Sequence, residues 1–127
     1  MSKILIRGAK VLGGEQQDVL IDGSVIEAVG TGLSAEGAEV VEAGGKVLLP
    51  GLVDLHTHLR EPGREDSETV LTGTRAAASG GFTAVFAMAN TFPVADTPRV
   101  VEQVYRRGPE SGNCDVQPNG ALTDGQE

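Results

Sequence analysis

The sequence predicts an α/β protein in which a small β domain, residues 1–50, precedes a series of β/α units, residues 51–127. Before Pro50, runs of strand-forming residues are separated by glycine-containing turns, whereas after Pro50 apolar strand-like runs alternate with helical patterns. Alternation of strand and helix is typical of a parallel sheet, which forms either an open doubly wound sheet or a (β/α) barrel.

The first domain is expected to be a small β-meander. Residues 3–12 and 18–29 are rich in side chains that favour strands. Within the second run, Asp22-Gly23 separates two apolar segments, which is a signal for a two-residue hairpin. A loose, glycine-rich connection then leads toward the boundary near Pro50.

The second domain opens with an apolar run at residues 52–56, which predicts a buried strand. A helix is predicted from Ser67 to Ser79, ended by Gly80-Gly81. Residues 82–88 are largely apolar, as in strands that a parallel sheet buries on both faces. The order strand, helix, strand therefore begins directly after the boundary.

A second helix is predicted to begin with Thr97 as N-cap and Pro98 at its first position, and to end at Gly108. A third strand is expected near residues 114–116. A complete barrel takes about 250 residues, whereas 77 residues follow Pro50 (127 − 50). The barrel interpretation therefore implies an incomplete barrel and a natural chain that continues past Glu127.

Charge and composition exclude several classes of function. The chain has 18 acidic and 10 basic side chains, a net charge of −8, which repels nucleic acid and anionic membranes. Cys114 is the only cysteine, so no internal disulfide can form. The apolar run before Arg7 is too short for a signal peptide, and no run of about 18 apolar residues exists. We expect a soluble, cytoplasmic protein.

Two histidines mark a candidate metal site. His56 and His58 stand at the end of the predicted strand, where side chains at positions i and i+2 point the same way and can reach one metal ion. Zinc needs three or four protein ligands, and this pair supplies only two. The alternative is that one histidine packs against the protein and the other faces solvent. Asp54 is two residues before His56 and so points to the same face of the predicted strand. It either orients an imidazole or has a structural role.

Arg60 and Asn90 are candidate substrate-binding residues. Arg60 precedes the turn Glu61-Pro62-Gly63 and could hold a substrate carboxylate through a bidentate contact. The alternative is a surface arginine paired with Glu61, Glu65 or Asp66. Asn90 is a common turn residue, yet a parallel sheet would bring it to the same edge as Arg60.

Residues 50–63, with Asp-x-His-x-His at 54–58, closely resemble the metal-binding signature of the amidohydrolase superfamily, which includes hydantoinases, allantoinases and deaminases. The continuation Arg-Glu-Pro-Gly at 60–63 resembles bacterial class I dihydroorotases. The similarity extends over nearly the whole chain, through residues 65–68, 80–83, 90–93 and 120–123. One departure is Ala89, where the family often has proline.

The resemblance implies the start of a metal-dependent-hydrolase (β/α)8 TIM barrel preceded by strands of a small β-sandwich domain. It implies that His56 and His58 are ligands of the more buried zinc of a binuclear centre, and that Arg60 and Asn90 hold the substrate carboxylate. The bridging ligand, two further histidines and the general acid/base aspartate are expected beyond Glu127. No catalytic residue is therefore expected here, and the isolated chain should be inactive.

The implied activity is dihydroorotase: the zinc-dependent, reversible cyclisation of N-carbamoyl-L-aspartate to L-dihydroorotate in pyrimidine biosynthesis. A homo-oligomer or a complex with aspartate transcarbamoylase is left open. One alternative is a hydantoinase or allantoinase, against which Arg60 argues. Another is a non-catalytic dihydroorotase-like partner of aspartate transcarbamoylase, against which the intact histidines argue. A further alternative is the product of a broken gene or an incomplete sequence, with no function of its own. The exposed apolar faces of such an incomplete barrel are expected to aggregate.

Overall fold

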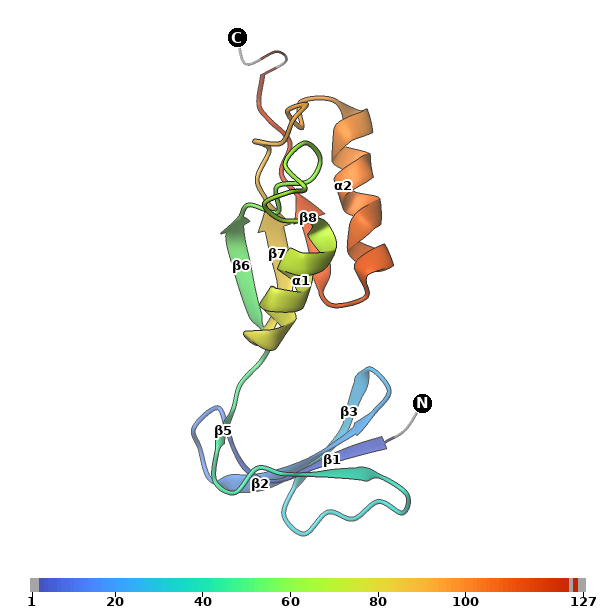
Figure 1. Ribbon diagram of the computed structural model, residues 1–127. Helices are drawn as coiled ribbons and strands as arrows, with labels where there is room; N and C mark the ends of the chain where they lie inside the picture. Colours follow the sequence, from blue (N-terminus) through green and yellow to red (C-terminus); the bar gives the residue numbers. More distant parts are fainter. Residues whose placement is uncertain (1–2, 124, 126–127) are drawn as a thin grey trace. The chain divides into compact units, whose positions relative to one another are not determined.

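The computed structural model describes residues 3–123 and 125. The chain separates into two compact units, the first ending at Pro50 and the second beginning at Gly51. Figure 1 shows strands β1–β5 in the first unit, and strands β6–β8 with helices α1 and α2 in the second. The extreme ends of the two predicted domains, residues 1–2, 124 and 126–127, lie outside the described residues.

The first unit is a five-stranded sheet with the order β3-β2-β1-β4, and β5 also pairs with β1. The predicted meander is confirmed, because β1, β2 and β3 pair antiparallel. The hairpin loop is Gly23-Ser24, one residue later than predicted, because Asp22 still pairs with Val25. The strands are β1 (Lys3–Val11), β2 (Gln16–Asp22), β3 (Val25–Gly30), β4 (Glu39–Glu42) and β5 (Val47–Leu48).

A buried carboxylate fastens a loop to this sheet. Asp18 on β2 accepts hydrogen bonds from the backbone N–H of Gly8 at 2.9 Å and of Leu33 at 3.0 Å. The bond from Gly8 is the main cause that holds the pKa of Asp18 below its usual value. Ionised Asp18 therefore ties the connection between β3 and β4 to β1.

The second unit is a three-stranded parallel sheet with the order β6-β7-β8. Its elements are β6 (Leu52–Thr57), α1 (Val70–Ser79), β7 (Phe82–Ala87), α2 (Pro98–Ser111) and β8 (Asp115–Pro118). Both helices pack on the face of the sheet that carries the core, which consists of Leu59, Val70, Val85, Ala87, Val104 and Val116. The predicted alternation of strand and helix is confirmed. Neither helix is long and apolar enough to cross a membrane.

Strand β6 differs from the prediction of a buried strand. Among the described residues it pairs only with β7, and Leu52, Val53 and Leu55 are 47%, 52% and 68% exposed. The helices contact β7 and β8 instead. In the described part of the chain, the apolar side chains of β6 are accessible to solvent because β6 is an edge strand.

Both helices have boundaries that differ from the predicted ones. Helix α1 begins after Thr69, whose side chain accepts the N–H of Thr72 in a capping box, so the predicted start at Ser67 was wrong. Helix α2 continues past Gly108 to the left-handed Gly112. A Cβ atom at position 108 would lie 2.8 Å from the Cβ of Val116, so Gly108 serves close helix–strand packing.

Candidate functional site

The two histidines lie side by side at the end of β6. Their ring centroids are 5.1 Å apart in an edge-on arrangement, with His56 exposed and His58 half-buried. The i, i+2 spacing predicted this proximity, because alternate strand residues point the same way. Two neighbouring imidazoles can supply two ligands to one metal ion.

Asp54 contacts the backbone of the histidine segment. Its Oδ1 accepts the backbone N–H of His56 at 3.0 Å, and this bond is the main reason that the pKa of Asp54 lies below its usual value. No hydrogen bond joins Asp54 to an imidazole ring within residues 3–123. The geometry therefore favours the structural alternative for Asp54.

Asn90, in the loop after β7, contacts His58 directly. The Nδ1 atom of His58 lies 2.8 Å from Oδ1 of Asn90. Because an amide oxygen only accepts, Nδ1 is the donor in this bond. In the neutral imidazole this tautomer carries its lone pair on Nε2, the atom that can bind a metal ion. The sequence predicted that these residues share one edge of the sheet, but it gave no signal for a direct hydrogen bond.

Arg60 follows β6 with a left-handed backbone conformation, φ +62°. Its guanidinium makes no ion pair or hydrogen bond with the residues that the structure describes. Two of the three alternative partners are engaged elsewhere: Glu61 pairs with Arg107, and Glu65 accepts the backbone N–H of Gly63 at 2.9 Å. Among the described residues, the interpretation as a paired surface arginine therefore finds no support.

The loops that carry Arg60 and Asn90 are packed against each other. The backbone N–H of Phe92 donates to the carbonyl oxygen of Pro62 at 2.9 Å. Gly63 has φ +105°, and a Cβ atom there would lie 2.3 Å from the carbonyl oxygen of Phe92. This close approach requires glycine and fixes the two loops relative to each other.

Sequence reasoning missed the burial of Glu61, which is 6% exposed. Its Oε2 accepts the backbone N–H of Val70 at 2.7 Å, and its Oε1 pairs with Arg107 of α2. The turn motif showed that Glu61 precedes Pro62-Gly63. Nothing in the local pattern indicated a partner on α2, because that contact depends on how the helices pack.

The donor set is incomplete for a metal centre within this unit. Among residues 3–123 and 125, no group of three or more histidine, cysteine, aspartate or glutamate side chains converges on one point. The described residues therefore offer two ligands, His56 and His58, to a metal ion that needs further ligands from elsewhere. Asn90 contacts His58, and Arg60 follows His58 by two residues in the chain. An amide and a guanidinium can both bind an anion.

Comparison with known proteins decides the family. The model of the dihydro-orotase-like family matches residues 45–127. The chain belongs to this family. Among curated relatives, the dihydroorotase of Streptomyces coelicolor is 86% identical over 127 residues, which are 100% of this chain and 30% of that protein. The dihydroorotase of Leifsonia xyli is 62% identical over 97% of this chain and 28% of its own length.

The chain thus spans about 30% of the length of the curated family members that it matches. The L-hydantoinase (dihydropyrimidinase) from Arthrobacter aurescens aligns with a TM-score of 0.78 at 22% identity, over 99% of this chain and 29% of that one. The dihydropyrimidinase from Brevibacillus agri aligns with a TM-score of 0.73 at 34% identity, over 98% and 28%. The predicted resemblance, and the prediction that the second unit is the start of an amidohydrolase barrel, are therefore confirmed.

Proposed function

We propose that this chain supplies the first part of a dihydroorotase active site, for the reversible cyclisation of N-carbamoyl-L-aspartate to L-dihydroorotate in pyrimidine biosynthesis. The observation that carries the proposal is an Arg60 guanidinium without a partner among the described residues, two residues after His58 of the adjacent histidine pair. The 86% identity to a protein named dihydroorotase supports the same substrate. The isolated chain is expected to be inactive, because the described residues offer only two metal ligands.

The proposed metal is zinc, held in part by His56 and His58. Bound zinc would lower the pKa of a water molecule and polarise the amide carbonyl of the substrate ring. The chain's own contribution is to orient the ligands. Asn90 fixes the ring of His58 by accepting from Nδ1, and Asp54 fixes the backbone of His56.

The substrate carboxylate is proposed to bind between Arg60 and Asn90. Because Oδ1 of Asn90 accepts from His58, the amide NH2 of Asn90 is free to donate to a carboxylate oxygen. Arg60 adds a planar pair of N–H donors and a positive charge. Asn90 would thereby connect substrate binding with the orientation of a metal ligand.

A hydantoinase is the second candidate, because proteins with that name share the fold and one dihydropyrimidinase is 34% identical. Hydantoin has no carboxylate for Arg60 to bind, so a guanidinium without a partner among the described residues favours dihydroorotate. Allantoinase is disfavoured for the same reason, and a non-catalytic partner of aspartate transcarbamoylase would not need the histidine pair. Cytoplasmic location, a homo-oligomer and a transcarbamoylase complex are proposals from the family resemblance alone.

The test is a chimera in which this chain replaces the matching segment of the Streptomyces coelicolor dihydroorotase. L-dihydroorotate, hydantoin and allantoin are assayed in parallel, and zinc content is measured. We expect turnover of dihydroorotate, and loss of both zinc and turnover in His56→Ala. Preferred turnover of hydantoin or allantoin would contradict the proposal, as would a folded chimera that binds no zinc.

A further inference from the structure

Glu61 is a buried carboxylate directly next to Arg60, and neither the metal nor the substrate interactions proposed above use it. Its side chain is 8% exposed, and both of its oxygens are engaged. Oε2 accepts the backbone N–H of Val70, the first residue of α1, and Oε1 pairs with Arg107 of α2. A buried charge is tolerated when it is paired and hydrogen-bonded in this way.

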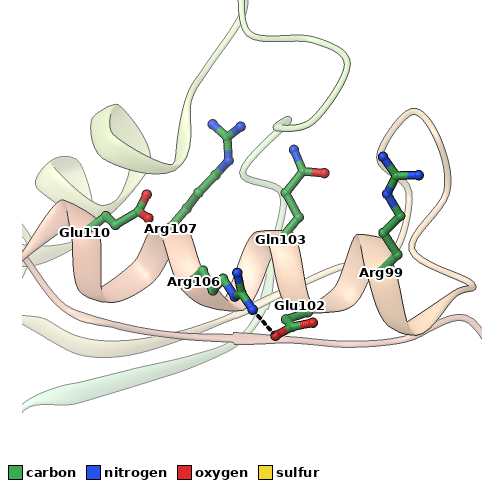
Figure 2. A pocket seen from close by; sticks show the side chains of 6 residues that line it. All are labelled: Arg99, Glu102, Gln103, Arg106, Arg107 and Glu110. Atoms are coloured by element: carbon green, nitrogen blue, oxygen red, sulfur yellow. Dashed lines mark hydrogen bonds and ion pairs between the residues drawn. The ribbon is translucent and has the colours of Figure 1, made fainter.

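Arg107 differs from its neighbour on the same helix. Its side chain is 37% exposed and reaches a carboxylate that is almost inaccessible, whereas Arg106 pairs with Glu102 and both are at least 60% exposed. Figure 2 shows Arg106 beside Glu102, with the Arg107 side chain extending away from that pair. Substitution of Arg107 removes an ion pair with a buried carboxylate, whereas substitution of its neighbour Arg106 removes only a surface ion pair. The two substitutions can therefore be compared directly.

These contacts restrict the backbone that directly follows Arg60. Arg60 occupies a left-handed conformation, which a non-glycine residue holds only when its surroundings impose it. The carbonyl oxygen of Arg60 accepts the backbone N–H of Arg64 at 2.9 Å. The next residue, Glu61, is fixed to α1 and α2 through its side chain. The turn that begins at Arg60 is therefore held by both its backbone and the Glu61 anchor.

We propose that Glu61 and Arg107 are positioning residues that hold Arg60 in the orientation that binds the substrate carboxylate. This inference rests on the proposed function. Removal of the anchor lets the turn sample other conformations, so Arg60 spends less time aligned with the carboxylate. The proposed metal ligands, His56 at the end of β6 and His58 just after it, precede the turn, so the chemical step is affected less than substrate binding.

The experiment measures kcat and KM for L-dihydroorotate in the chimera. We expect Glu61→Ala and Arg107→Gln to raise KM roughly tenfold while kcat stays within about twofold, since they weaken alignment of a binding group. Glu61→Gln should have a smaller effect, because its amide oxygen can still accept from Val70. Arg106→Gln is the matched control and should leave both constants unchanged.

A double-mutant cycle with Arg60→Ala separates positioning from a general loss of stability. In the Arg60→Ala background, Glu61→Ala and Arg107→Gln should raise KM no further. An equal rise in that background, or no rise in the presence of Arg60, would overturn the inference. If Glu61→Ala fails to fold, the partly exposed Arg107→Gln carries the same test. An unsubstituted chimera that folds, binds zinc and lacks dihydroorotate turnover would instead refute the proposed function.

Discussion

The Nδ1 atom of His58 and the Oδ1 atom of Asn90 are 2.8 Å apart, so the end of β6 and the loop after β7 share a hydrogen bond at the candidate site. One side of the bond belongs to a proposed metal ligand, and the other to a proposed carboxylate-binding residue. The bond orients the imidazole and, at the same time, leaves the Asn90 amide NH2 free. Metal affinity and substrate affinity should therefore both depend on Asn90.

Asn90→Ala tests this dependence in the chimera. Loss of a hydrogen bond that orients a metal-bound histidine is expected to weaken zinc affinity by about 10- to 100-fold. The KM for dihydroorotate should rise in the same variant. Competition with a chelator measures the zinc affinity. Asn113→Ala is the control, because Asn113 precedes β8 and its amide donates to Thr74 of α1 at 3.2 Å, not to a histidine. Unchanged zinc affinity in Asn90→Ala would show that the hydrogen bond has no role in metal binding.

Arg60→Lys tests whether the guanidinium fork is needed. Lysine keeps the positive charge but cannot form the planar bidentate contact with a carboxylate. Loss of one hydrogen bond to a charged group is worth about 1.5 to 3 kcal/mol, which is roughly tenfold or more in KM. Steady-state kinetics of the chimera measure the effect, with Arg64→Lys as the control. An unchanged KM would contradict a bidentate role for Arg60.

Gly63→Ala tests the packing of the two loops. The new Cβ atom would lie 2.3 Å from the carbonyl oxygen of Phe92 at φ +105°. Gly81→Ala is the matched control, since Gly81 has φ +86° but nothing within 4 Å of a Cβ atom. Backbone strain alone costs of order 1–3 kcal/mol, so Gly63→Ala should lower the free energy of unfolding by more than Gly81→Ala. Equal losses in urea denaturation would show that the loop contact is unimportant.

Asp18 should make the first unit sensitive to acid. Its pKa in the folded state lies below the usual value, mainly because of the hydrogen bond from Gly8. The stabilisation is therefore present above the ordinary aspartate pKa and is lost as the pH falls through the lower folded-state pKa. The hydrogen–deuterium protection factors of the Gly8 and Leu33 amides, which are corrected for the pH dependence of intrinsic exchange, should fall over that range. Asp18→Asn should remove the pH dependence, and its persistence in this variant would assign it to another group.

The sequence predicted the order of the second unit and the proximity of His56 and His58, because hydrophobic runs and the i, i+2 rule are local. It misplaced the end of α2, because Gly108 resembles a helix stop and its packing against Val116 is a tertiary contact. The Glu61–Arg107 pair was not predictable for the same reason. The accessible β6 also escaped prediction, since apolar composition does not reveal which strand lies at an edge.

Arg60 and Asn90 are proposed to make this site selective for a ring that bears a carboxylate. The most direct measurement is kcat/KM of the zinc-loaded chimera for L-dihydroorotate and hydantoin, with and without Arg60→Ala. We predict a strong preference for dihydroorotate that disappears in Arg60→Ala, while hydantoin turnover, where detectable, does not fall. A preference that survives in Arg60→Ala, or a preference for hydantoin in the unsubstituted chimera, would contradict the claim.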